Sequence, residues 1–170
     1  MSLRLRPYRT NDESAAVAIH ESMLPEHFHF LLGWESGMSW SAFLSSIEDQ
    51  RRGRHLSQYQ VRGRQLVADV DGEVIGRVSL RYELNEFLSE RGGHIGYGVA
   101  PAHRRKGYAT EILRQALVVI RAEGVDAVLV TCDEDNVASA RTIERNGGVF
   151  DSISPPSCGE VETVRRYWIH

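Results

Sequence analysis

The sequence predicts a mixed α/β fold in a single domain that spans residues 1–170. Three observations lead to this fold class. Short strand-like runs alternate with amphipathic helical segments, an Asp71-Gly72 pair separates two apolar runs, and residues 94–132 have the pattern of a strand, a helix and a buried strand. The expected order is β-α-α-β-β-β-α-β-α-β-β, a mixed sheet of about seven strands with about four helices.

The N-terminal half contains one strand, two helices and a hairpin. Residues 3–9 alternate apolar and basic side chains, which is typical of a strand, and Thr10 with Glu13 has the spacing of a capping box before a helix of about 12 residues. In residues 39–53, apolar residues recur at i, i+3, i+4 and i+7, and a glycine ends the pattern. The two strand-like runs around the Asp-Gly pair form an antiparallel hairpin.

The C-terminal half begins with the strand "HIGYGV" at 94–99. The strongest helix pattern of the chain runs from Ala109 to Ile120 and stops at Gly124. A continuous apolar run at 127–132 predicts a strand buried on both faces and parallel to the first, across the helix.

The last helix and two strands complete the order. "DNVASARTIERNGG" predicts a helix with Asn136 as its N-cap, and it ends at a pair of glycines. Residues 149–153 and 163–169 predict the two final strands.

Composition excludes several function classes. Apolar residues make up 42% and charged residues 25%, which are the proportions of a globular chain. No apolar run approaches the roughly 20 residues of a membrane span, and the N-terminus lacks a signal-peptide core, so we expect a cytoplasmic protein without a membrane partner. A net charge of −3 argues against a nucleic-acid partner. Cys132 and Cys158 form neither a disulfide framework nor a metal pattern, and Cys132 is expected to be a small core residue.

A basic turn joins the strand at 94–99 to the long helix. Arg104, Arg105 and Lys106 precede Gly107 at the helix start, where unpaired N–H groups and the helix dipole favour an anion. Gly96 and Gly98 lie within the strand and not after it, and Pro101 stands where the third glycine of the dinucleotide-binding fingerprint should be, so that fingerprint is not supported. Glycines inside a strand predict instead that it is bent or splayed from its neighbour, leaving a cleft above the turn.

Several segments together resemble the GNAT superfamily of N-acetyltransferases. The run Val99-x-Pro101-x-x-Arg104-x-x-Gly107-x-Ala109 resembles the acyl-CoA motif of that family. The segments "RYELNEFL", "GGHIGYGVAP", "KGYATEIL", "LVTCDEDNVAS", "IERNGG" and "RRYWI", in this order, are similar to a bacterial subgroup of predicted GNAT acetyltransferases whose acceptors are generally undefined. The resemblance covers essentially the whole chain.

The resemblance implies that acetyl-CoA is the co-substrate and that a primary amine attacks it directly in a ternary complex. The strand from Tyr97 to Val99 would pair with the pantetheine arm, and a strand N–H near Val99 would stabilise the oxyanion. The pyrophosphate would bind at the turn, formed by Arg104, Arg105, Lys106, Gly107, Tyr108 and Ala109. Asn136 and Ser139 would border the thioester, although capping explains Asn136 equally well.

Two positions depart from the pattern of the family. Ile143 stands where many members have a tyrosine that protonates the leaving thiolate, and Thr131 stands where several have a glutamate base. The general acid and base therefore stay unassigned, with Tyr97, His94 and Glu83 as weak candidates.

The acceptor site is expected near the first two helices and the loop after the third strand. Trp34, in a glycine-containing loop, is the aromatic candidate, whereas Trp40 fits the helix stripe and the core. Glu83 and Asn85, with Glu86, would reach an acceptor amine if their loop folds over the cleft. The histidines of "EHFHF" lack metal-ligand spacing, so no metal is expected.

Two hypotheses about the function stay open. The first is an acetyl-CoA-dependent N-acetyltransferase that acts on a primary amine, as a monomer or homodimer. The second is a non-catalytic acyl-CoA-binding or sensor domain, which the missing tyrosine and glutamate keep open. A nucleic-acid-binding module ranks third, because the basic clusters lack interleaved aromatic residues.

Overall fold

The structure is a computed structural model that describes residues 2–157 and 159–170, so Cys158 lies outside the described residues. The strands are β1 (Leu3–Arg6), β2 (Gly63–Val70), β3 (Glu73–Arg81), β4 (Ile95–Val99), β5 (Val128–Asp133), β6 (Val149–Ser154) and β7 (Val164–Ile169). The helices are α1 (Glu13–Met23), α2 (Trp40–Arg52), α3 (Glu86–Glu90), α4 (Tyr108–Ala122) and α5 (Val137–Arg145). Short 3-10 turns cover Thr10–Asp12, Leu24–Glu26 and Pro101–His103.

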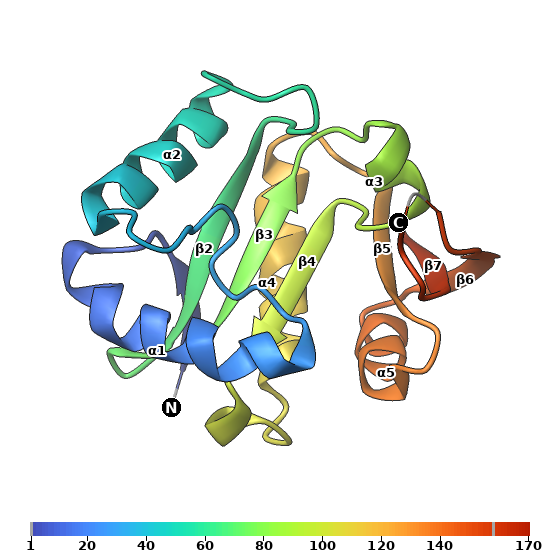
Figure 1. Ribbon diagram of the computed structural model, residues 1–170. Helices are drawn as coiled ribbons and strands as arrows, with labels where there is room; N and C mark the ends of the chain where they lie inside the picture. Colours follow the sequence, from blue (N-terminus) through green and yellow to red (C-terminus); the bar gives the residue numbers. More distant parts are fainter. Residues whose placement is uncertain (1, 158) are drawn as a thin grey trace.

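The seven strands follow the predicted order but divide into two antiparallel sheets. One sheet has the order β1-β2-β3-β4, and the other has the order β5-β7-β6. The sequence predicts β4 and β5 as parallel neighbours. In the structure the two strands meet at one end, where the His94 N–H donates to the Leu129 carbonyl (2.8 Å). Beyond that bond they diverge (Figure 1), as the prediction of a splayed strand requires.

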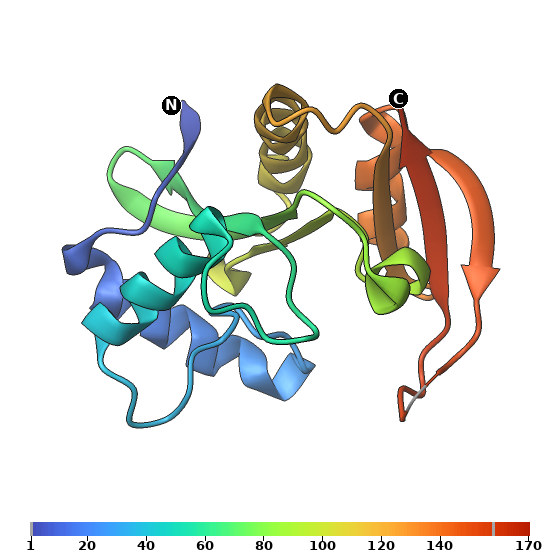
Figure 2. The ribbon, with the colours of Figure 1, turned by 90° about the horizontal axis from the view of Figure 1, so that it is seen from above.

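The four-stranded sheet is covered on both faces (Figure 2). On one face, α4 buries Ile112, Leu113, Ala116, Leu117 and Ile120, the stripe that the sequence predicts, against apolar residues of both sheets. On the opposite face, α1, α2 and the loop between them form a second cluster around Phe30, Phe43 and Trp40. The central strands therefore have no face in water.

The structure confirms the predicted hairpin turn at Asp71-Gly72 and the predicted end of the second helix at Gly53. Asp71 and Gly72 both have positive φ (52° and 90°), as the two-residue hairpin requires. The side chain of Ser39 caps α2, and Gly53 ends that helix in the left-handed conformation (φ 70°).

The start of α1 differs from the prediction, because the capping box between Thr10 and Glu13 is not formed. Asp12 is turned inward and accepts hydrogen bonds from the Arg9 N–H (2.7 Å) and from the guanidinium of Arg6 (2.7 and 2.9 Å). A contact between β1 and the helix start replaces the local cap. The five-residue helix α3 is also an addition to the predicted order.

Candidate functional site

The edge of β4 that faces β5 is the first component of the site. β4 ends the four-stranded sheet, and on its other side the Ala100 N–H donates to the Ile75 carbonyl of the β3 ladder (2.9 Å). Because N–H groups alternate sides along an antiparallel strand, those of Tyr97 and Val99 point away from β3 and toward β5. The divergence of the two sheets leaves this stretch of edge outside any ladder. An extended ligand can therefore pair with it.

Gly98 on this strand is explained by a close approach. A Cβ at Gly98 would lie 2.4 Å from a ring carbon of Phe28, which belongs to the loop between α1 and α2. Such a distance is an overlap, so a side chain at residue 98 would displace the Phe28 ring from its place against β4.

The turn between β4 and α4 is the second component. Arg105 and Gly107 both have positive φ (62° and 81°), and α4 begins directly afterward at Tyr108. Within the described part of the chain, the backbone N–H groups of residues 105–110 take part in no hydrogen bond. A Cβ at Gly107 would meet no atom within 4 Å, which places this residue at open surface. Such a set of free N–H groups at a helix start is suited to phosphate oxygens.

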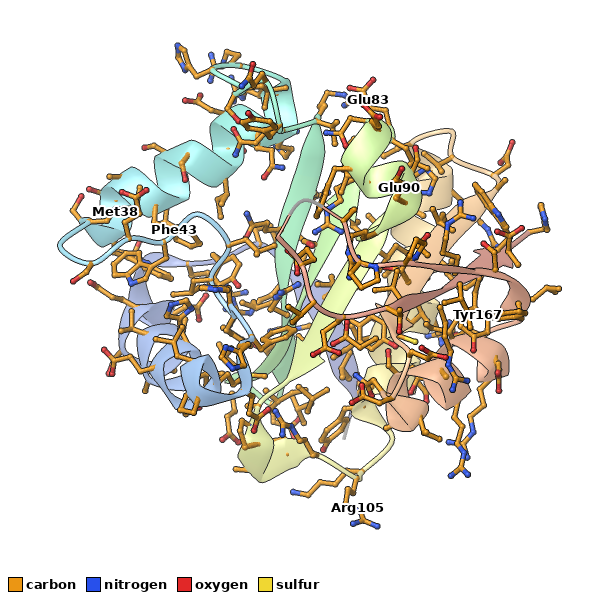
Figure 3. The ribbon with its side chains drawn as sticks, turned by 45° about the vertical axis from the view of Figure 1, so that its right-hand side comes forward. Met38, Phe43, Glu83, Glu90, Arg105 and Tyr167 are labelled. Carbon is orange, nitrogen blue, oxygen red and sulfur yellow. The ribbon has the colours of Figure 1, made fainter. Side chains whose placement is uncertain are left out.

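Positive charge surrounds the turn unevenly. Arg105 and Lys106 are exposed, and Figure 3 shows the Arg105 side chain at the outer end of the molecule. Arg104 is held in place: its two terminal nitrogens donate to the carboxylate of Glu26 (3.0 and 2.8 Å) and its Nε donates to the Val99 carbonyl (3.2 Å). The hydrogen bonds from Arg104 lower the pKa of Glu26 below its ordinary value.

Tyr108 and Ala109 are half-buried and pack against the main core, so they anchor the helix start beneath the turn.

The start of α5 lies next to β4 and is the third component. The Asn136 side chain accepts a hydrogen bond from the Ser139 N–H (3.1 Å), so it has the capping role. The hydroxyl of Ser139 shares a hydrogen bond with the hydroxyl of Tyr97 (2.7 Å), which links α5 to β4 across the divergence of the sheets. Burial raises the pKa of Tyr97 to about 12, so its hydroxyl keeps its proton at neutral pH. Ile143, one turn further along α5, is fully buried.

His94 and Thr131 lie at the end where β4 and β5 meet, and the side chain of each accepts a hydrogen bond from the backbone. His94 is buried, and its Nδ1 accepts a hydrogen bond from the Leu129 N–H (2.9 Å). Burial and the nearby Arg81 lower the pKa of His94, so it is neutral at pH 7. The Thr131 hydroxyl accepts a hydrogen bond from the Gly92 N–H (2.9 Å), which fixes the loop before β4.

The residues expected near the acceptor do not gather at one point. Glu83 is exposed and lies at the opposite end of the molecule from Arg105 (Figure 3). Asn85 caps α3 by accepting from the Leu88 N–H (2.9 Å). Trp34 is half-buried and packs edge-on against Trp40 and Phe43, with ring centroids 5.9 and 5.8 Å away. Among the predicted site residues in ranges 2–157 and 159–170, those of the β4 edge, the turn that follows it and the start of α5 that contacts β4 are neighbours in the structure.

Two classes of site find no support in the described residues. No group of three or more His, Cys, Asp or Glu side chains in residues 2–157 and 159–170 is placed to hold a metal ion. No helix in the same ranges combines the length and apolarity that a bilayer span requires. Cys132 is buried at the end of β5, and burial raises the pKa of its thiol to about 11, which keeps it unreactive.

Comparison of the sequence with known proteins gives a family match and one curated relative. A family model described as "Acetyltransferase (GNAT) domain" matches residues 2–149. An "Uncharacterized N-acetyltransferase YjdG" of Bacillus subtilis (strain 168) is 31% identical over 61 residues, which are 35% of this chain and 36% of that protein. The match thus spans about a third of the length of that relative.

The fold is similar to solved structures. RimJ of Mycobacterium smegmatis, in complex with CoA-disulfide, has a TM-score of 0.73 at 20% identity, covering 98% of this chain and 81% of that one. The putative acetyltransferase yncA of Salmonella typhimurium, with acetyl-CoA, has a TM-score of 0.66 at 17% identity, covering 100% and 94%. At these identities the likeness shows the shared fold.

Proposed function

Because the chain belongs to the GNAT acetyltransferase family, we propose that it transfers the acetyl group of acetyl-CoA to a primary amine by direct attack in a ternary complex. One observation carries this proposal: the unpaired edge of β4 leads directly into a helix start with free N–H groups. An extended arm that ends in phosphates fits this sequence of surfaces. The two solved relatives were determined with CoA ligands, which supports the same co-substrate here.

The residues of this chain divide the binding between them. The N–H groups of Tyr97 and Val99 on the β4 edge would hold the pantetheine arm, and the N–H groups of residues 105–109 would hold the pyrophosphate. Arg105 and Lys106 add exposed positive charge at the same end, whereas Arg104 is engaged with Glu26. Bound acetyl-CoA would supply the thioester that the amine attacks, and the Val99 N–H would stabilise the negative charge that develops on the thioester oxygen.

Tyr97 is the proton donor that we assign for the leaving thiolate. Its hydroxyl lies on the β5-facing side of the site, bonded to Ser139, and it is protonated at neutral pH. The position that carries a tyrosine in many family members is the buried Ile143, one helical turn from Ser139. His94 accepts a backbone bond and Glu83 lies at the far end of the molecule, so Tyr97 is the better placed of the three candidates.

A thiol-release assay with acetyl-CoA and a panel of amines, beside calorimetry of CoA binding, tests the proposal. We expect CoA binding and acetyl-CoA-dependent thiol release with at least one primary amine, together with acetylated product. Binding without turnover of any amine would favour the non-catalytic sensor. The observation that favours this second function is the buried Ile143 at the position where many family members have a tyrosine. Absence of CoA binding would reject both functions.

A further inference from the structure

Arg77, at the centre of β3, is a buried cation with free donors. Arg77 is only 4% exposed, and its Nη2 donates to the His29 carbonyl (3.0 Å). Its guanidinium lies over the ring of Phe28, 4.6 Å from the ring centroid. Among the described residues, its Nε and Nη1 have no hydrogen-bond partner.

In the part of the chain that the structure describes, no carboxylate forms an ion pair with Arg77. In the described ranges 2–157 and 159–170, neither Arg77 nor the neighbouring Arg81 forms an ion pair. Burial lowers the pKa of Arg77 to about 10, so the guanidinium is still charged at neutral pH. A buried charge without a counter-charge costs several kcal/mol. A protein that keeps such a charge next to its active strand is prepared for an anionic ligand.

Three donors converge on one point of β4. Ser79 of β3 pairs with Gly96 of β4, and a Cβ built on Gly96 would lie 3.2 Å from the Ser79 Oγ. The same point is 3.5 Å from Arg77 Nη1 and 3.5 Å from Arg81 Nη1. The Ser79 hydroxyl, like Arg77, has no partner among the described residues, whereas Arg81 donates to the Gly92 carbonyl (2.9 Å). Gly96 is partly exposed, whereas Arg77 Nη1 and the Ser79 hydroxyl are buried, so an anion reaches this point only when the side chains around it move aside.

We propose that Arg77, Ser79 and Arg81, the Gly96 donor cluster, bind a carboxylate of the acceptor, so that the acceptor is an amine that also carries a carboxylate. The inference rests on the proposed function, whose acceptor it specifies. The free Nη1 of Arg77 and the hydroxyl of Ser79 can donate to the two oxygens of a carboxylate, and the positive charges of Arg77 and Arg81 favour an anion. Gly96 precedes Val99 by three residues, about 10 Å along the strand, and a contact of about 3 Å at each end leaves about 4 Å between the amine and the carboxylate of the acceptor. Acceptors with several bonds between amine and carboxylate, such as 4-aminobutyrate or an N-terminal aspartyl residue, therefore fit best.

The cluster lies on the face of the sheet opposite α4, because Arg77 contacts His29 and Phe28 in the loop between α1 and α2. Arg77, Ser79 and Arg81 alternate with Val78 and Leu80, which belong to the α4-side core. The acceptor would thus approach from the face opposite the helix whose N-terminus holds the phosphates, and the two substrates would not compete for the same donors.

A binding measurement tests the cluster without any turnover. The Nε–H resonance of Arg77 is assigned by its loss in Arg77→Lys, and the protein is titrated with 4-aminobutyrate, 4-aminobutyramide, Asp-Ala amide and Asn-Ala amide. We expect a saturable shift of this resonance with each acid and none with the matching amide, in which an uncharged carboxamide replaces the carboxylate. O-phosphoethanolamine is a further ligand, and a stronger response to it than to every carboxylate would overturn the carboxylate assignment.

Ser79→Ala separates a binding role from a structural one. Because the Ser79 hydroxyl is buried and unpartnered, we expect its removal to leave the thermal unfolding midpoint unchanged or higher. The same change should weaken binding of 4-aminobutyrate about fivefold to tenfold. A lower midpoint with unchanged binding would make the hydroxyl a structural group and overturn the cluster.

The activity assay distinguishes failure of this inference from failure of the proposed function. In wild type, kcat/KM should be at least tenfold higher for each acid than for its amide, and Arg77→Met should abolish this ratio. Arg64→Met, which removes one charge from β2 on the same face as Leu66, should keep it. Equal turnover of acids and amides with a silent Arg77 resonance overturns the inference and leaves acetyl transfer intact. A shifted resonance without any turnover supports the cluster and rejects the transferase.

Discussion

Replacing Gly107 by aspartate places a carboxylate at the turn where the phosphates of CoA are proposed to bind. Gly107 immediately precedes α4 and is exposed. The matched control is Gly107→Asn, which has nearly the same shape and no charge. Comparison of the two variants separates repulsion from the cost of adding a side chain.

The structure sets the size of the expected effect. The φ of 81° costs a residue with a Cβ about 1–2 kcal/mol, and aspartate and asparagine share this cost. No atom lies within 4 Å of the added Cβ, so neither variant creates a clash. A carboxylate about 4 Å from a phosphate charge is repelled by about 1 kcal/mol in water and about 4 kcal/mol at an effective dielectric constant of 20. At this exposed position we expect about 1.4 kcal/mol, a tenfold weaker affinity.

Calorimetric titration with CoA measures this difference. The Kd of Gly107→Asp should be about tenfold higher than that of Gly107→Asn, and the ratio should shrink as salt screens the repulsion. Thermal unfolding checks that both variants fold alike. Equal affinities in two folded variants would show that the turn does not bind the phosphates.

Three further changes test other parts of the structure. Tyr97→Phe should lower the free energy of unfolding by about 1 kcal/mol in urea and lower kcat about a hundredfold, and an unchanged kcat would reject Tyr97 as proton donor. Asp12→Asn should cost about 3 kcal/mol at pH 7 in urea denaturation, because it leaves the buried Arg6 with one partner fewer. Burial acts to raise the pKa of Asp12, but the bonds from Arg6 and from the Arg9 backbone outweigh it and lower the pKa. The stability from this pair is therefore complete above the unfolded pKa of about 3.9 and is lost as the pH falls through the folded value, so the difference between wild type and variant should shrink at pH 3; a constant difference would contradict the assignment. Glu26→Gln should free Arg104 and tighten CoA binding about twofold to fivefold in calorimetry, since exposed ion pairs contribute up to about 1 kcal/mol, and a weaker affinity would show that the pair positions the turn.

Local patterns explain which parts of the fold were predictable. The stripe of α4, the positive-φ pair Asp71-Gly72 and the stop at Gly53 each depend on residues close together in the chain. The same holds for the turn at residues 104–107, where basic side chains, a glycine and a helix start are adjacent. Such features can be predicted from the sequence because the residues that form each one are close together in the chain.

Features that depend on distant contacts were not predictable. In the sequence, Asp12 has the pattern of a local helix start, but its partner Arg6 also bonds Asp69, 63 residues further along the chain than Arg6. In the sequence, Arg77 alternates with apolar residues, which is typical of a strand with one face in water. The loop between α1 and α2 buries that face, and only the structure reveals a charge without a counter-charge there.

A titration of the protein with CoA, followed by the backbone amide resonances, tests the central claim most directly. The site predicts saturable shifts at the amides of Tyr97 and Val99 on the β4 edge and of residues 105–109 at the turn, because these N–H groups have no partner among the residues that the structure describes. If saturating CoA leaves these resonances in place, the account of the site is contradicted.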